Sequence, residues 1–70
     1  MNRFVIVLLA ALERVPLERR AVLMMHDLDD ASMRDVAAAL SIPLFTAYSR
    51  LRKARRELEE ALRRTMERGL

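Results

Sequence analysis

Apolar residues recur along the C-terminal part of this 70-residue chain at alternating spacings of three and four. An α-helix has about 3.6 residues per turn, so this spacing gathers them on one side of a long amphipathic helix. The far end of that helix mixes charges of both signs, and we expect it to project into solvent or to pack on a neighbour. The predicted buried stripe comprises Leu44, Ala47, Leu51, Ala54, Leu58 and Ala61.

Three shorter helical segments precede the long helix. The first should end before Pro16, because the residue preceding a proline is disfavoured in a helical conformation. Ser32 is a good N-cap for the third, since its side chain accepts from a free amide of the first turn. The expected helices are residues 3–14, 17–28, 33–40 and 44–68, in one domain over residues 1–70.

A tight turn separates the last two predicted helices. It consists of Ser41, Ile42 and Pro43, and the proline suits the start of a helix, where its missing N–H costs nothing. Two helices joined by so short a turn are typical of a helix-turn-helix, whose second helix lies in the major groove of DNA. The pattern therefore predicts a small all-α, four-helix domain with a C-terminal helix-turn-helix and a long last helix.

Positive charge is concentrated just after this turn. The formal net charge is only +3, so the distribution of charge carries more information than its sum. A cationic helix that follows the turn of a helix-turn-helix favours contact with DNA. A merely solvated helix face is the alternative that composition alone allows. Five cations fall within seven residues: Arg50, Arg52, Lys53, Arg55 and Arg56.

Several chemistries are excluded by composition. The chain has no cysteine, and its one histidine, His26, cannot build a metal centre alone. Its one glycine, Gly69, cannot form a glycine-rich phosphate loop. We therefore expect no enzyme, no metal and no cofactor. His26 next to Asp27 at a helix end is interpreted as a capping feature, with a proton switch as the alternative.

The segment Phe4–Leu12 is apolar around its whole circumference. It covers about half of the roughly 20 residues that a membrane-spanning helix needs, and no convincing cleavage site follows it. Leu8–Leu12 favours a helix over the strand that the β-branched residues before it would allow. Three small helices cannot enclose it, so we expect self-association or capture by a partner. The candidate contact residues are Phe4, Val5, Val7, Leu8 and Phe45.

The stretch from Ala11 to about Leu58 resembles region 4 of bacterial RNA polymerase sigma factors, in the extracytoplasmic-function branch. The most informative part is SMRDVAAALSIPLFTAYSRLRKARR over residues 32–56. No single residue match is specific to the family, but the spacing of all the matches together is. The pattern positions are Pro16, Arg20, Ser32, Ala37, Leu40, Ile42, Pro43, Thr46, Ser49, Arg50, Leu51, Ala54 and Arg55.

The resemblance implies a role in transcription initiation in the cytoplasm. The last helix would enter the major groove of double-stranded promoter DNA at the -35 element. The domain would also dock on the β-subunit flap of RNA polymerase, and an anti-sigma factor could mask it. The resemblance assigns base-facing positions to Tyr48, Ser49, Arg52 and Lys53, and phosphate contacts to Ser32, Thr46, Arg50, Arg56 and Arg20.

The chain departs from the family pattern at four positions. Asp30 and Ser41 stand where the pattern has glycine, and a left-handed backbone suits aspartate better than serine. Phe45 replaces a glycine and Tyr48 replaces a lysine or arginine. These two rings favour either a different sequence preference or a surface covered by protein. A sigma-like interaction module is therefore the alternative function, and the DNA-binding domain of a response regulator is a third.

Overall fold

The computed structural model describes residues 2–68, and those residues form helices joined by short loops, with no strand among them. The predicted all-α fold is confirmed. The second helix differs in detail, because its last turn is a π-helix. The elements are α1 (Arg3–Glu13), α2 (Leu17–Leu23), the π-helical turn η1 (Met24–Leu28), α3 (Met33–Leu40) and α4 (Leu44–Glu67).

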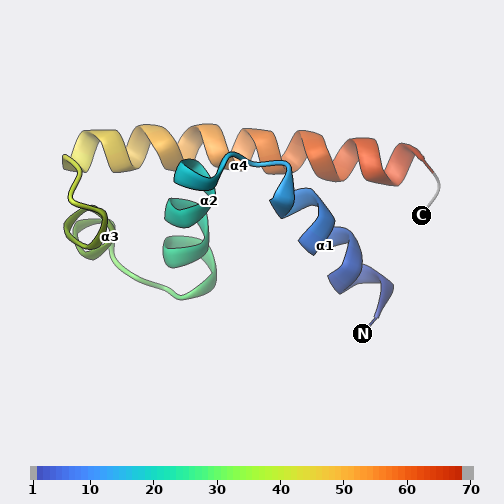
Figure 1. Ribbon diagram of the computed structural model, residues 1–70, viewed down its shortest axis with the longest axis horizontal. Coiled ribbons are helices and arrows are strands. Elements are labelled where there is room, and N and C mark those ends of the chain that lie inside the picture. Colours follow the sequence, from blue (N-terminus) through green and yellow to red (C-terminus); the bar gives the residue numbers. More distant parts are fainter. Residues whose placement is uncertain (1, 69–70) are drawn as a thin grey trace.

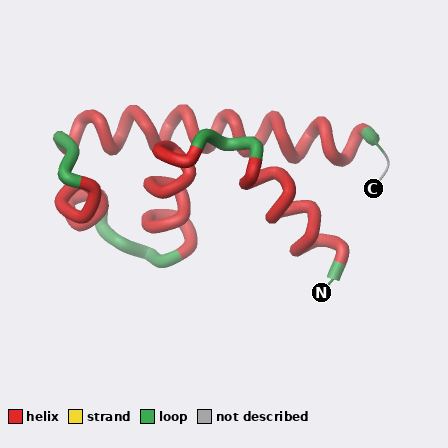
Figure 2. The backbone as a smooth tube through the Cα atoms, viewed as in Figure 1, coloured by secondary structure: helices red, strands yellow, loops and turns green. Residues whose placement is uncertain are grey.

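Helix α4 runs along the whole molecule, and the other three helices lie on one side of it (Figure 1). Its 24 residues span about 36 Å at 1.5 Å per residue, close to the longest dimension of 39 Å. α3 lies beside the start of α4, α2 beside its middle and α1 beside its C-terminal half (Figure 1). The short loops between helices appear green in Figure 2. The opposite side of α4 is therefore left uncovered by the other helices.

The core lies between α4 and the three short helices. Val15, Val22 and Val36 are its largest fully buried side chains. Ala47 and Ala54 are also fully buried, and their small side chains allow α2 and α3 to approach α4 closely. This packing orients α4: the predicted stripe faces inward except at Leu44, which is 40% exposed, and most residues between its members face solvent.

The far end of α4 does not simply project into solvent. α1 packs against it, so that Ala61 is buried and Leu62 and Thr65 are half-buried. Met66, near the end of the helix, is 71% exposed. The sequence analysis did not foresee this contact, because it treated the first helix as surplus apolar surface. One side of that helix, through Leu8 and Leu12, covers α4.

The π-helical turn η1 was not predicted. It carries the wide hydrogen bonds from Asp29 N to Met24 O and from Ala31 N to Met25 O, at 3.1 and 3.0 Å. The His26 Nδ1 atom lies 2.8 Å from the carbonyl oxygen of Ala31 and ties the turn to the following loop. Such turns are often found near functional sites. Here the turn presents Asp27 to α4.

Two non-glycine residues adopt a left-handed backbone, Asp30 with φ 60° and Ser41 with φ 55°. Both stand at positions where the family pattern has glycine, whereas Phe45, which also replaces a glycine, does not have a positive φ. Ser41 closes the end of α3, where Ile42 N donates to Ala37 O at 3.0 Å. The sequence analysis had identified serine as the poorer fit to this conformation. The structure therefore locates backbone strain at Ser41.

Ser41→Gly is expected to raise the free energy of unfolding by about 0.5–1 kcal/mol. The strain that a Cβ causes in the left-handed region exceeds the entropy that glycine adds to the unfolded chain. The melting temperature, measured by circular dichroism, should rise by about 2–8 °C. Ser41→Ala keeps the Cβ and serves as the control. Equal melting temperatures for the two variants would contradict the strain.

Candidate nucleic-acid interface

The uncovered side of α4 gathers most of the predicted DNA-contacting side chains. Phe45 is 76% and Tyr48 is 50% exposed, whereas Ser49 is half-buried. Three cations of the cluster are exposed on the same side. We call this the outward surface, and it comprises Phe45, Tyr48, Ser49, Arg52, Lys53 and Arg56.

The outward surface keeps its positive charge because its cations make no internal ion pair. Among residues 2–68, no carboxylate oxygen lies within 4.0 Å of the side-chain nitrogens of Arg52, Lys53 or Arg56. Past this point α4 carries Glu57, Glu59 and Glu60. The cations of the outward surface thus end at Arg56, the thirteenth of the 24 residues of α4, and a helix-turn-helix contacts base edges from the start of its second helix.

Arg55, by contrast, is engaged within the domain. Its Nε and one terminal nitrogen donate to the two carboxylate oxygens of Asp27, at 2.9 and 2.7 Å. These hydrogen bonds hold the pKa of Asp27 below its ordinary value, although desolvation acts in the opposite direction. The pair joins η1 to one flank of α4. Arg55 is therefore a structural cation, unlike the other members of the cluster.

A second bidentate pair holds the other flank of α4. Arg19 of α2 donates from Nε and a terminal nitrogen to the two oxygens of Glu57, at 2.6 and 2.8 Å. These bonds lower the pKa of Glu57, and the charges of Arg56 and Lys53 lower it further. Paired forks of this kind fix geometry as well as energy. The two pairs lie on opposite flanks of α4 and support the orientation that the core packing sets.

Sequence reasoning missed both pairs. It treated Asp27 as a capping residue and assigned no role to Arg19 or Glu57. The partners lie 28 and 38 residues apart, so no local spacing relates them. The only available signal was an acid near the end of the second predicted helix and a cation near the middle of the fourth. Without tertiary structure that match was one among many.

The predicted phosphate-binding residues are spread over three elements. Ser32 Oγ accepts from Asp35 N at 3.1 Å, which confirms the cap and leaves the hydroxyl hydrogen available to donate. Thr46 and Arg50 are half-buried on α4, one turn apart. Arg20 lies on α2, and its Nε donates to Val15 O at 3.1 Å. This contact turns Arg20 toward the α1–α2 junction and away from the outward surface.

The predicted partner surface is only partly free. Phe4 is 78% and Val5 is 37% exposed, but Val7 is half-buried and Leu8 packs against the core. Ile6 and Leu9, which the sequence analysis did not single out, are 52% and 46% exposed. α1 therefore has one covered side and one exposed apolar side.

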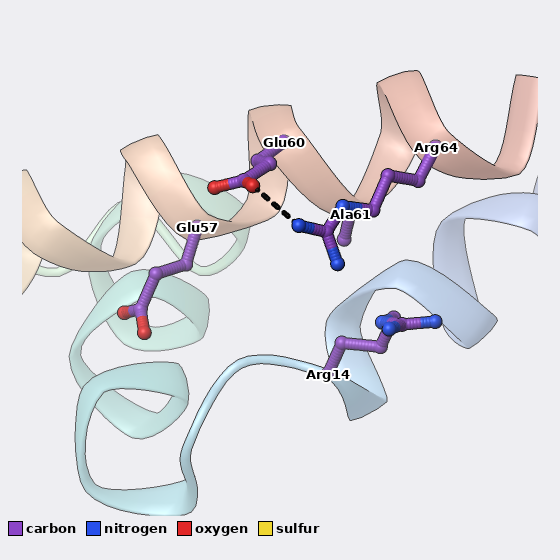
Figure 3. Close-up of a pocket in the computed structure, with 5 residues that line it drawn as sticks. All are labelled: Arg14, Glu57, Glu60, Ala61 and Arg64. Carbon is purple, nitrogen blue, oxygen red and sulfur yellow. Dashed lines mark hydrogen bonds and ion pairs between the residues drawn. The ribbon is translucent and has the colours of Figure 1, made fainter. Parts of the chain in front are cut away.

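A charged pocket lies where α1 meets the second half of α4 (Figure 3). Arg14 lines it from α1, and Glu57, Glu60, Ala61 and Arg64 line it from α4. Arg64 donates to Glu60 at 2.9 Å, and Glu57 is held by Arg19. The charges in this pocket thus neutralise one another largely within the domain. It lies farther along α4 than the outward surface, which ends at Arg56.

Comparison with known protein families decides what this arrangement is. The family described as Sigma-70, region 4 matches residues 6–58, more than half of the chain. The chain belongs to the sigma-70 region 4 family. No curated protein and no solved structure matched it. The sigma-factor resemblance is thus confirmed at the level of region 4.

Sigma-70 region 4 is a non-enzymatic DNA-binding domain of transcription factors, as the sequence analysis expected. The match includes every residue predicted to contact DNA and ends just beyond the outward surface. Phe4 and Val5 lie before it. Among residues 2–68, no helix is both long enough and apolar enough to cross a bilayer.

Asp27→Asn is expected to lower the free energy of unfolding at pH 7 by up to about 1 kcal/mol, the usual range for a partly exposed ion pair. The pKa of Asp27 is lowered in the folded chain, so the pair stabilises the fold above the unfolded pKa near 4. That contribution disappears as the pH falls through the lowered pKa. Urea unfolding of both chains across this range provides the measurement.

Asp29→Asn, at an exposed position one residue beyond η1, is the matched control and should leave stability unchanged at both ends of the range. The difference between wild type and Asp27→Asn should vanish in acid. A difference that persists at low pH would show that the carboxylate charge is not what stabilises this contact.

Proposed function

We propose that this domain recognises the -35 element of promoters through the outward surface and docks on the β-subunit flap of RNA polymerase. In this proposal it acts in the cytoplasm, as part of an extracytoplasmic-function sigma factor. The observation that carries the proposal is that three cations without internal partners stand on the uncovered side of the second helix of a helix-turn-helix.

The dimensions of α4 support insertion into the major groove. A helix with its side chains is about 10–12 Å across, and the groove of B-DNA is about 12 Å wide. Tyr48, Ser49 and Arg52 are the fifth, sixth and ninth residues of α4, within the part of a recognition helix that contacts base edges. Lys53 extends the same surface by one residue. These four side chains are proposed to contact bases.

Phosphate contacts would position the helix in the groove. Arg56 is exposed beside the proposed base-contacting residues, and Arg50 and Thr46 lie on the flank of α4. Ser32, at the start of α3, offers a hydroxyl donor. Arg20 is left out, because its hydrogen bond to Val15 O turns it away from the outward surface. We propose that the other four residues hold the DNA backbone on either side of the groove.

The exposed side of α1 is proposed to bind protein. Ile6 and Leu9 leave an apolar surface on the side of α1 that no other described helix covers, and Phe4 is exposed in the first turn of the helix. Docking on RNA polymerase, masking by an anti-sigma factor or pairing of two copies would each cover it. This surface also supports the second candidate function, a sigma-like interaction module with little DNA binding of its own.

Arg52→Ala and Lys53→Ala are expected each to cost about 1–3 kcal/mol in binding to the preferred promoter duplex, because each removes a contact to a base edge. Discrimination against the wrong base at one position should relax as well. Fluorescence anisotropy with duplexes carrying single base changes measures both effects. Arg63→Ala, an exposed change farther along α4, is the matched control and should cost much less.

Equal affinity of all three variants for promoter and scrambled duplexes would contradict base reading by α4. Analytical sedimentation, which measures the oligomeric state, distinguishes DNA recognition from the second candidate function. A monomer that binds promoter DNA rejects the interaction module. A stable dimer that buries Phe45 and fails to bind DNA supports the module instead.

A further inference from the structure

Two aromatic rings stand exposed at the start of α4. Phe45 is 76% and Tyr48 is 50% exposed, and they are the second and fifth residues of the helix. Residues three apart on a helix are neighbours on its surface, so the two rings form one continuous apolar patch. No described side chain covers it. An apolar group held in solvent at this position needs a reason.

The surroundings of the rings favour DNA over an apolar protein partner. Arg52 stands one turn beyond Tyr48, and Arg52 and Arg56 line the same pocket between η1 and α4 as Tyr48. The acid Glu59 also lines this pocket, and Arg55 there is already paired with Asp27. A protein covering the rings with apolar side chains would have to desolvate these cations, which is costly without paired charges. A duplex offers phosphates to the cations and an apolar group to the rings.

The apolar group that the major groove offers is the C5-methyl of thymine. Phe45 has no hydrogen-bonding atom in its side chain, so it cannot distinguish donors from acceptors on the other bases. Its position nearest the start of α4 is one that a helix-turn-helix brings to base edges. The Tyr48 ring extends the apolar contact by one turn and adds a hydroxyl.

We propose that Phe45 and Tyr48 are specificity-determining residues that read thymine through its methyl group. The preferred site of this domain would then carry thymine opposite the start of α4. This inference rests on the proposed function and adds to it the base that these two positions select. The family pattern has glycine at position 45 and lysine or arginine at position 48. Neither offers an aromatic ring for contact with a methyl group.

The test removes only the methyl group. The preferred duplex is first selected from a randomised library with the full 70-residue chain at low salt. Each thymine is then replaced singly by deoxyuridine, and the dissociation constant is measured by anisotropy. At one or two thymines the replacement should weaken binding about fourfold, the effect of burying one methyl-sized group. In Phe45→Ala the same replacement should have no effect.

Met66→Ala is the matched control, since Met66 is 71% exposed and lies near the opposite end of α4 from Phe45. It should keep the fourfold effect. Tyr48→Phe should keep it as well, and Tyr48→Ala should reduce it. Circular dichroism checks that each variant is folded.

Each other outcome overturns the inference in a distinguishable way. Sequence-specific binding that is indifferent to every thymine methyl removes the inference and leaves the proposed function standing. If Phe45→Ala and Tyr48→Ala both keep the full methyl effect of the wild-type chain, other residues read the thymine. Failure of the wild-type chain to bind any selected duplex removes the proposed function and this inference together.

Discussion

Raising the salt concentration from 50 to 200 mM is expected to weaken binding of this domain to its promoter duplex about 250- to 1,000-fold. Each phosphate that a cation neutralises releases counterions, so log K falls against log salt with a slope of about −0.9 per contact. Four to six contacts give a slope of roughly −4 to −5. Anisotropy titrations at several salt concentrations yield the slope directly.

We propose that exposed cations of the outward surface contribute to this slope. Arg52, Lys53 and Arg56 are exposed, whereas Arg55 is bound to Asp27. Arg56→Ala should therefore reduce the slope by about 0.9, as one lost phosphate contact requires. Arg64→Ala is the control, because Arg64 lies in the α1–α4 pocket and pairs with Glu60. A slope near zero in the wild-type chain would contradict DNA binding through this surface.

Leu51→Ala is expected to destabilise the domain by about 2–5 kcal/mol, the range for truncating a buried leucine. Leu51 is 4% exposed and lies in the core cluster that joins α4 to the short helices. A chain of this size has on the order of 4–10 kcal/mol of stability in total. The variant should therefore be close to unfolding at 25 °C, and DNA binding should be lost with the fold. Urea unfolding followed by circular dichroism measures the change.

Leu44→Ala provides the comparison within the same helix. Leu44 belongs to the same predicted stripe but is 40% exposed, since it stands in the first turn, before the helix enters the core. Its truncation should cost less than about 1.5 kcal/mol, because a large part of its surface already faces water and less apolar area is lost from the core. Equal losses for the two variants would contradict the packing of α4 against α2 and α3.

Much of the fold could be predicted from local signals. The spacing of Leu51, Ala54 and Leu58 specified the inner side of the last helix, and Pro16, Ser32 and Pro43 marked helix boundaries. Such signals act within one or two turns, so they are legible in a single sequence. The family pattern added the left-handed positions Asp30 and Ser41, which the backbone confirms.

The candidate site was predictable in outline only. The cations and the helix that carries them were identified, but the difference between Arg55 and its neighbours was not. Periodicity places Arg55 and Arg52 within one turn of each other and cannot distinguish them. What distinguishes them is Asp27, a residue brought into reach by the π-helical turn η1.

By itself, then, the amino-acid order determined which segments are helical, which side of α4 is apolar and where positive charge accumulates, because these depend on neighbours along the chain. Tertiary structure alone decided which cations remain available, which apolar residues of α1 are covered and how α4 is turned about its axis. Those outcomes depend on contacts between residues as far apart as Arg19 and Glu57, whose pairing requires the chain to be folded.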